Sequence, residues 1–145
     1  MPEVLLKKLK PGARIPSKGS PDAAGYDLYA CLDAPVIIQP GETAAIGTGI
    51  SCALPKGYFG GCFARSGLAL REGLRPANCV GVVDSDYRGE YIVALHNDSA
   101  ESRTVQNGDR IAQLVILPCL SVTFAEAEAL PETDRGAGGF GSTGK

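Results

Sequence analysis

Residues 36–64 read VIIQPGETAAIGTGISCALPKGYFGGCFA, and this stretch indicates the fold class of the chain. Three short runs of residues that favour strands are separated by turns containing proline and glycine: Val36–Ile38, Thr43–Ile50 and Gly57–Ala64. Short apolar or β-branched runs bounded by such turns are typical of consecutive strands and unlike long helices. The stretch therefore predicts strands joined by tight turns.

The same pattern extends over the rest of the chain. Further β-prone runs are Val4–Leu9, Ala23–Tyr29, Ala77–Val83, Tyr91–His96, Arg110–Leu117 and Val122–Glu126. One short helix is predicted at Ser66–Glu72, where Ser66 can cap the helix and the following residues favour it. Many short, evenly spaced strands predict an all-β antiparallel sandwich, jelly roll or barrel.

Length and composition agree with a single β-rich domain. The chain has 145 residues, of which 44% are hydrophobic and 21% charged, enough for one hydrophobic core. Nineteen glycines and ten prolines make up a fifth of the chain, against an average of about 12%. This excess argues against helical bundles, coiled coils and doubly wound α/β folds. No apolar run approaches the roughly 20 residues that span a bilayer.

Charge, cysteine and histidine content exclude several function classes. A net charge of −2 and a pI of about 5.4 give no electrostatic basis for binding duplex nucleic acid. The five cysteines have no metal-binding spacing and are expected to be reduced and mostly buried. The single histidine, His96, is expected to be a strand residue rather than a catalyst. Residues 1–4 lack the layout of a signal peptide, so a cytoplasmic location is expected, with the nucleus and organelles left open.

Residues 78–89 form the densest group of candidate functional residues. An apolar run leads into Asp84 and Asp86, with Tyr87 and Gly89 close behind. Neighbouring carboxylates are what a hydrolase needs to polarise a water or anchor a metal. The alternative interpretation is a solvated hairpin turn, since aspartate, serine and glycine are ordinary turn residues.

Three other segments have both a chemical and a structural interpretation. Arg65 and Ser66 stand at a strand-to-helix junction, which suits either an anion or an ordinary helix cap. Asp27 lies in an apolar run, where an acid is either a structural anchor or a site residue. Arg110 and Gln113 are three residues apart, so in a regular strand they would face opposite sides.

The last eleven residues differ from the rest of the chain. Residues 135–145 read RGAGGFGSTGK and hold five of the nineteen glycines. A frayed terminus is one interpretation. The other is a lid that becomes ordered on binding, because glycine backbones next to arginine, serine and threonine can wrap around phosphate oxygens.

Taken in order, these segments resemble the five motifs of the trimeric dUTPase (deoxyuridine triphosphate nucleotidohydrolase) family. The motifs are residues 24–30 (AGYDLYA), 64–69 (ARSGLA), 81–89 (GVVDSDYRG), 108–114 (GDRIAQL) and the tail 135–144 (RGAGGFGSTG). Each motif alone is weak, whereas five in order form a specific signal. The resemblance implies a jelly-roll-like homotrimer with sites at subunit interfaces, in which a core of residues 1–134 precedes a lid of residues 135–145.

The resemblance also implies the reaction. A dUTPase hydrolyses dUTP to dUMP and pyrophosphate, with Mg²⁺ bound to the triphosphate rather than to a protein cage. This activity removes dUTP and supplies dUMP for thymidylate synthesis. Asp84 matches the catalytic acid that activates a water for attack on the α-phosphorus. Tyr87 matches the residue under the deoxyribose, and Asn78 and the backbone up to Val83 match the contacts to uracil.

Further residues match substrate-binding positions of the family. The phosphate-contacting positions are Arg65, Ser66, Gly67 and Gln113. The tail contributes Arg135, Gly139, Ser142 and Thr143, with Phe140 over the uracil ring. Asp27 matches an acid near the water shell of the metal or near the phosphate-handling arginines, and the separate roles of Asp86 and Arg110 stay open.

Three alternatives remain beside this interpretation. A dCTP deaminase or a bifunctional deaminase–dUTPase would share the fold, although residues 84–87 and the complete tail favour dUTPase. A nucleotide-gated binding protein would use the tail to signal to a partner. A purely structural β-domain would not need Asp84.

Overall fold

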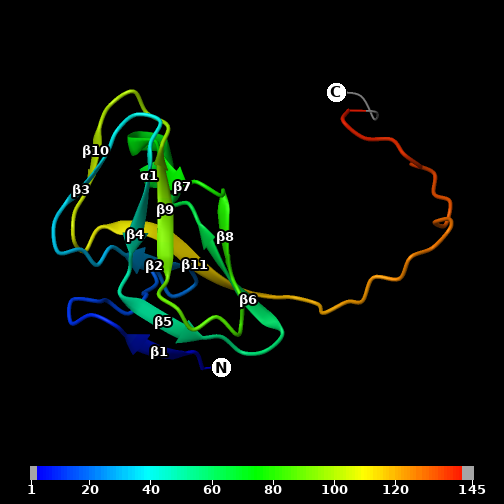
Figure 1. The fold of residues 1–145 in the computed structure, drawn as a ribbon, viewed down its shortest axis with the longest axis horizontal. Coiled ribbons are helices and arrows are strands. Elements are labelled where there is room, and N and C mark those ends of the chain that lie inside the picture. The colour runs from blue at the N-terminus through cyan, green and yellow to red at the C-terminus, as the bar shows by residue number, and fades with distance from the viewer. Residues whose placement is uncertain (1–2, 142–145) are drawn as a thin grey trace.

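Antiparallel pairing between strands distant in sequence organises the chain (Figure 1). The computed structural model describes residues 3–141. Its elements are β1 (Leu5–Lys8), β2 (Tyr26–Tyr29), β3 (Val36–Ile38), β4 (Thr43–Gly47), β5 (Ile50–Ala53), β6 (Tyr58–Phe63), α1 (Ser66–Glu72), β7 (Leu74–Pro76), β8 (Val80–Val83), β9 (Ile92–Asn97), β10 (Arg103–Val105) and β11 (Arg110–Pro118).

The strands form four small sheets around one core. The largest has the order β2-β11-β6-β8, another has the order β4-β9-β7, and the pairs β1-β5 and β3-β10 complete the fold. Each sheet contributes fully buried side chains to a single cluster, for example Leu28, Ile46, Ile50 and Ile38. This all-β, jelly-roll-like arrangement with one short helix confirms the predicted fold class.

Most of the predicted elements are present. The strand Val36–Ile38 and the helix Ser66–Glu72 have the predicted bounds. The predicted cap was wrong, because Arg65 and not Ser66 occupies the N-cap position, and no side chain caps the helix. At seven residues, α1 is also far shorter than the roughly 20 residues that cross a bilayer.

The predicted strand Thr43–Ile50 is interrupted. β4 ends at Gly47 and β5 begins at Ile50, because Gly49 has a φ of +68°, a left-handed conformation that breaks an extended strand. A side chain at residue 49 would also collide with Ala13 and Cys31. The two halves belong to different sheets, since β4 pairs with β9 and β5 pairs with β1.

Three further differences concern short or unpartnered segments. The sequence prediction missed β7 and β10, which have three residues each and lie at sheet edges, where pairing rather than residue pattern makes the strand. The predicted strand Val122–Glu126 was wrong for this single chain. Its residues are exposed and no strand pairs with them, so the alternating apolar pattern has no partner here.

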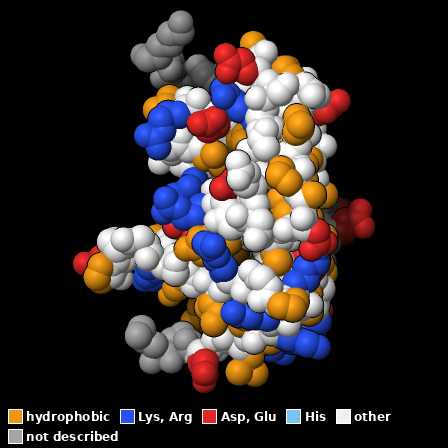
Figure 2. All heavy atoms as spheres, turned by 90° about the vertical axis from the view of Figure 1, so that its left-hand side faces the viewer, with side chains coloured by type: hydrophobic (Ala, Val, Ile, Leu, Met, Phe, Trp, Pro, Cys, Tyr) orange, Lys and Arg blue, Asp and Glu red, His pale blue; other side chains and the backbone are white. Residues whose placement is uncertain are grey.

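The chain leaves the body of the fold after β11. From residue 119 it runs outward as a long extended segment (Figure 1), and Phe124 and Phe140 are fully exposed. A local turn interrupts it near Arg135, whose Nε donates to the carbonyl of Gly138 at 2.8 Å. In Figure 2, acidic, basic and apolar side chains are interspersed on the face shown, so this face offers no continuous basic surface.

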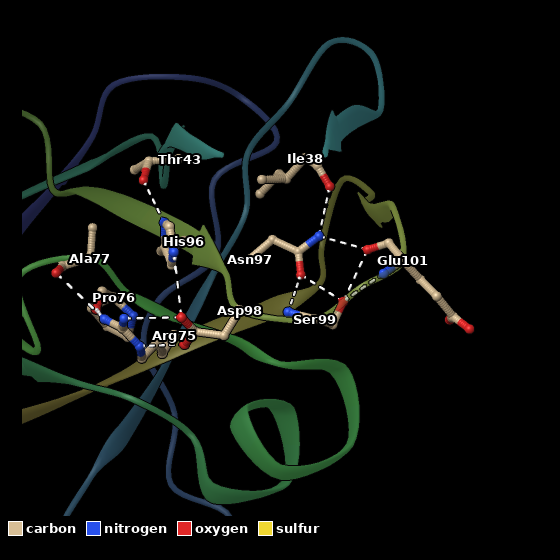
Figure 3. Close-up of polar contacts among 10 residues, drawn as sticks. All are labelled: Ile38, Thr43, Arg75, Pro76, Ala77, His96, Asn97, Asp98, Ser99 and Glu101. Carbon is tan, nitrogen blue, oxygen red and sulfur yellow. Dashed lines mark hydrogen bonds and ion pairs between the residues drawn. The ribbon is translucent and has the colours of Figure 1, made fainter. Parts of the chain in front are cut away.

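A buried asparagine joins the loop after β9 to β3 (Figure 3). Asn97 is fully buried, and its side-chain amide donates to the carbonyls of Ile38 at 2.9 Å and Glu101 at 2.7 Å. Its side-chain oxygen accepts from the backbone and the hydroxyl of Ser99. All the polar capacity of this buried side chain is therefore used.

His96 lies beside this asparagine on β9, as expected for a strand residue. Its Nδ1 lies 2.9 Å from the hydroxyl of Thr43, and its Nε2 lies 3.4 Å from Asp98 (Figure 3). The Arg75 guanidinium hydrogen-bonds Asp98 and holds the pKa of that carboxyl below its usual value. The cluster ties β7 to the end of β9.

Two buried thiols and a phenol lie in the core beside β6. Burial, with a smaller contribution from Cys52, raises the pKa of the Cys62 thiol from 9.0 to about 11. Burial likewise raises the pKa values of Cys52 and Tyr91. Cys31, Cys52 and Cys62 are buried, and Cys79 and Cys119 are exposed, with no disulfide among the described residues.

The Asn97 contacts predict a large effect of one substitution on stability. Asn97→Ala should lower the free energy of unfolding by about 2–4 kcal/mol, because buried backbone groups lose their partners. Urea denaturation at fixed protein concentration measures this change. Ser102→Ala, which removes an exposed hydroxyl bonded to Gln39, is the control and should have little effect. Equal stability of the two variants would contradict the assignment.

Cys62 predicts a loss of stability in alkaline solution. Below pH 9 the thiol is protonated in both states, whereas between pH 9 and pH 11 only the unfolded chain loses the proton. The free energy of unfolding should therefore fall over this window, by about 2–3 kcal/mol for this group. Denaturation at pH 8 to 11 should show a steeper decline for the parent than for Cys62→Ala. Parallel declines would count against the prediction.

Candidate active site

A pocket of about 240 Å³ lies between β8 and β9. It brings together four residues that the sequence predicted for substrate contact or catalysis: Asn78, Val83, Asp84 and Tyr87. Its volume is below the roughly 300–1,000 Å³ of pockets that enclose a whole drug-sized ligand. The pocket therefore suits one part of a ligand, with the remainder extending beyond its rim.

The backbone of β8 forms one wall of this pocket. β8 is the last strand of the sheet β2-β11-β6-β8 and pairs only with β6. Its other edge therefore leaves backbone N–H and C=O groups without a ladder partner. A row of alternating donors and acceptors is what the polar edge of a planar base requires. The residues before β8 form a tight turn, in which Cys79 has a φ of +62°.

Asp84 stands where the chain leaves β8. A turn follows it, in which the Tyr87 N–H donates to the Asp84 carbonyl at 3.2 Å. Asp84 is exposed and also lines a second, open hollow, together with Ser85, Asp86 and Arg88. Asp86 lines that second hollow and not the β8–β9 pocket, so the two carboxylates do not share this pocket. A ligand in the pocket has access to the Asp84 carboxylate at its rim.

Tyr87 lies at the mouth of the pocket. Its hydroxyl donates to the Glu90 carbonyl at 3.0 Å, and its ring packs at a tilt against Tyr91, with 6.4 Å between the ring centroids. Glu90 and Tyr91 also line the pocket, although sequence reasoning did not select them. The only sequence signal for Glu90 was its place as a single acidic residue between Gly89 and an apolar run.

A second group of predicted residues surrounds Asp27. Its carboxylate, only 13% exposed, accepts from Arg65 Nε at 2.8 Å on one oxygen and from an Arg110 terminal nitrogen at 3.3 Å on the other. Arg65 also donates to the Arg110 carbonyl at 3.3 Å. The three side chains carry a net charge of +1. Of the two positions that the resemblance implied for Asp27, the geometry favours the one beside the arginines.

A bulge in β11 places Arg110 and Gln113 on one face. The pairing with β2 shifts between Arg110 and Ala112, after which Gln113 stands opposite Asp27. Residues directly opposite in an antiparallel pair share a face, and Arg110 also contacts Asp27. The expectation for a regular strand, in which the two side chains point to opposite sides, was therefore wrong because of the bulge.

Gln113 connects three of the predicted motifs. Its amide nitrogen donates to the Ala64 carbonyl at 2.9 Å, directly before Arg65. Its side chain packs so closely on Gly25 that a Cβ there would collide with it. Ser66 and Gly67 follow in the first turn of α1, whose N–H groups no side chain caps. We call the residues of this second cluster the Arg65 group: Asp27, Arg65, Ser66, Gly67, Arg110 and Gln113.

Asp84 and the Arg65 group lie toward opposite ends of β6, and the β8–β9 pocket runs along β8 from Asn78 to Asp84. Gly60 pairs with Val83, and Phe63 pairs with Val80, so Asp84 lies level with Phe59 near one end of β6 and Arg65 lies beyond the other end. At about 3.3 Å per residue, the six steps from Phe59, level with Asp84, to Arg65 span roughly 20 Å. One chain therefore does not bring its own Asp84 and its own Arg65 together.

The tail residues lie apart from both groups. Arg135, Gly139 and Phe140 belong to the outward-running segment (Figure 1), and Ser142 and Thr143 lie outside the described residues. Among residues 3–141, no three His, Cys, Asp or Glu side chains are grouped to hold a metal ion.

Comparisons with known proteins identify the family of the chain. The sequence model of the dUTPase family matches residues 12–144. The deoxyuridine 5'-triphosphate nucleotidohydrolase of Desulfitobacterium hafniense is 52% identical over 132 residues, covering 90% of this chain and 87% of that protein. The enzyme of the same name from Syntrophotalea carbinolica is 47% identical over 141 residues, covering 97% and 96%.

A solved structure also shows similarity to a dUTPase, at lower sequence identity. The dUTPase of Staphylococcus bacteriophage 80alpha with dUpNHpp superposes with a TM-score of 0.91 at 27% identity, and each chain is covered completely. Sequence and fold therefore agree over essentially the whole length, and this chain belongs to the dUTPase family of enzymes.

Proposed function

We propose that this chain hydrolyses dUTP to dUMP and pyrophosphate, thereby removing dUTP and supplying dUMP for thymidylate synthesis. One observation carries the proposal beyond family membership: the unpaired edge of β8 leads directly to the exposed Asp84 carboxylate in one pocket. A base bound along that edge would place its sugar near Tyr87 and its first phosphate near Asp84.

Base selection follows from the donors and acceptors of the β8 edge. Uracil presents two carbonyl oxygens and one N–H, which can bond to backbone groups and to the Asn78 amide at the pocket wall. Cytosine exchanges a donor for an acceptor and would leave buried polar groups unpaired, at a cost of roughly 1–3 kcal/mol per group. The extra methyl group of thymine needs space that a pocket of about 240 Å³ would not provide beside the sugar.

Asp84 would act as the general base. Its carboxylate accepts a proton from a water as the water oxygen bonds to the α-phosphorus. The bond from the α-phosphorus to the bridging oxygen of the β-phosphate breaks, and pyrophosphate leaves with that oxygen. Because attack is in line, the water must lie opposite the leaving group. Asp84 stands on the pocket rim, where it is accessible to both a water and the first phosphate.

The Arg65 group would bind the phosphates. Asp27 holds Arg65 through Nε, so a terminal guanidinium nitrogen is free to bind phosphate oxygens. The uncapped N–H groups at Ser66 and Gly67 add donors, and Gln113 fixes the preceding backbone at Ala64. Mg²⁺ would be held by triphosphate oxygens and water rather than by side chains, neutralising charge on the leaving pyrophosphate.

A complete site would need more than one copy of the chain. The roughly 20 Å between Asp84 and Arg65 along β6 exceeds the length of a triphosphate. We therefore propose a homotrimer, with the pocket of one subunit facing the Arg65 group of another. The exposed alternating residues Leu120, Val122 and Phe124 support this assembly, because such a segment buries its apolar side only against a partner.

The tail would complete the site as a lid, with residues 1–134 as the core and residues 135–145 as the closing segment. Its extended path leads away from its own body, which suits a site on a neighbouring subunit (Figure 1). Phe140 is fully exposed and free to stack on uracil, an interaction worth about 1–3 kcal/mol per base. Arg135, Gly139, Ser142 and Thr143 would then bind the terminal phosphates.

The Asp84 assignment predicts a separation of binding from turnover. Asp84→Asn keeps the shape of the side chain but removes the base, so hydrolysis of dUTP should fall by at least about a hundredfold. Binding of dUTP, measured by calorimetry with the same variant, should persist. Asp86→Asn is the matched control, since Asp86 lies outside the β8–β9 pocket, and it should retain turnover. Near-normal pyrophosphate release by Asp84→Asn would refute the role.

The lid assignment predicts a separation of turnover from assembly. Deleting residues 135–145 should reduce kcat/KM for dUTP by about tenfold or more, because water exclusion and phosphate contacts are lost. Light scattering should give the same trimer mass as for the full chain, because no described strand includes the deleted residues. Unchanged turnover would indicate that the tail is a frayed terminus and not a lid. Parallel assays with UTP, dTTP and dCTP test selectivity, and ammonia release from dCTP would indicate a deaminase.

A further inference from the structure

The loop that carries Tyr87 is held by the break between β4 and β5. We call residues Thr48–Ser51 the clamp and residues Arg88–Tyr91 the strap. Five hydrogen bonds join them. Thr48 donates to the Tyr91 carbonyl from its N–H at 3.1 Å and its hydroxyl at 2.6 Å, and the Tyr91 N–H donates to the Ile50 carbonyl at 2.9 Å. The Ser51 hydroxyl donates to the Arg88 carbonyl at 2.7 Å, and the Gly49 N–H donates to the Glu90 carboxylate at 2.8 Å.

The clamp is made of buried polar groups. Thr48 is 1% exposed and Ser51 is 7% exposed, and both hydroxyls donate to strap carbonyls. Buried hydroxyls are costly unless they are bonded, so their presence implies a need to hold the strap. The break at Gly49, with its φ of +68°, directs an N–H out of the strand ladder toward the strap.

Glu90 connects the clamp to Tyr87. Its backbone carbonyl accepts the Tyr87 hydroxyl at 3.0 Å, while its carboxylate accepts the Gly49 N–H. A Cβ on residue 47 would lie 2.6 Å from the Glu90 carboxylate, so Gly47 leaves the space that this side chain fills. Within residues 3–141 Glu90 forms no ion pair. The Gly49 N–H is thus the hydrogen-bond donor that the Glu90 carboxylate contacts.

The Tyr87 side chain contacts the strap at three residues. The residue is 44% exposed; its hydroxyl bonds to Glu90, its ring packs on Tyr91, and a Cβ at Gly89 would collide with the phenol. All of these neighbours belong to the strap. The angle of the Tyr87 ring therefore depends on where the strap sits, and the strap sits where the clamp holds it.

We propose that Glu90 is a positioning residue that sets the Tyr87 ring for discrimination between deoxyribose and ribose. This inference rests on the proposed hydrolysis of dUTP and on the place of Tyr87 under the sugar. Glu90 acts through Tyr87 and not on the phosphates. Loss of the carboxylate removes one of the five hydrogen bonds, loosens the strap at Glu90 and widens the space at C2'. The kcat/KM for UTP should therefore rise relative to that for dUTP.

The experiment compares kcat/KM for dUTP with kcat/KM for UTP in five proteins: the parent, Glu90→Ala, Glu90→Gln, Tyr87→Ala and Glu42→Ala. Glu42 is the matched control, because its carboxylate also accepts a backbone N–H in a turn, that of Gln39 at 3.4 Å, remote from the pocket. The glutamine variant keeps an oxygen acceptor for Gly49. If Glu90→Ala does not fold, Ser51→Ala replaces it in the comparison, because it removes one hydrogen bond between clamp and strap without changing Glu90.

Glu90→Ala should lower the dUTP-to-UTP ratio by about tenfold, mainly through a higher KM for dUTP and a gain of UTP turnover. Tyr87→Ala should lower it at least as far, whereas Glu90→Gln should stay within about threefold of the parent and Glu42→Ala should match it. Ser51→Ala should move the ratio in the same direction.

Two results would overturn the inference while leaving the proposed function intact. One is a ratio in Glu90→Ala equal to the parent while Tyr87→Ala loses selectivity. The other is an equal loss of selectivity in Glu90→Gln and Glu90→Ala, which would mean that an oxygen acceptor for the Gly49 N–H does not position Tyr87. A parent protein that releases no pyrophosphate from dUTP would instead overturn the proposed function, and with it this inference.

Discussion

The register of β6 is the constraint on which both halves of the site depend. This strand pairs with β8 on one side and β11 on the other. The register of β6 therefore sets the positions of both Asp84 and Gln113 along the sheet. Glycines at residues 60 and 61 allow the close packing, because a Cβ at either position would meet Leu114 or Phe63 within 3 Å. A slip by one residue would turn the buried set of β6 toward solvent and separate Gln113 from Ala64.

Sequence reasoning predicted the elements that carry a local signal. Val36–Ile38 and α1 have short, well-punctuated patterns, and their bounds were correct. β7 and β10 gave no such signal, because three-residue edge strands exist through pairing with distant segments. The break at Thr48-Gly49 was also hidden, since threonine and glycine are tolerated in strands, and only the two different partners of β4 and β5 reveal it.

For the site, the residue types were predictable and their grouping was not. Motif order selected Asn78, Asp84 and Tyr87, and the structure brings these three to one pocket. The contact of Asp27 with Arg110 comes with a bulge in β11 that no local pattern marks. Glu90 escaped notice because its role comes from a hydrogen bond to Gly49, which is distant in sequence. Long-range backbone contacts of this kind leave no periodic trace in a sequence.

The free edge of β8 has a consequence for the behaviour of the protein in concentrated solution. The unpaired backbone groups of such an edge can accept a strand from another molecule, and such edges promote aggregation when they are long and flat. β8 limits this hazard by having four residues, by a left-handed turn at Cys79 before it and by a charged turn after it. A ligand in the β8–β9 pocket would cover part of this edge. Substrate and product would then act as solubility factors for the enzyme that consumes and releases them.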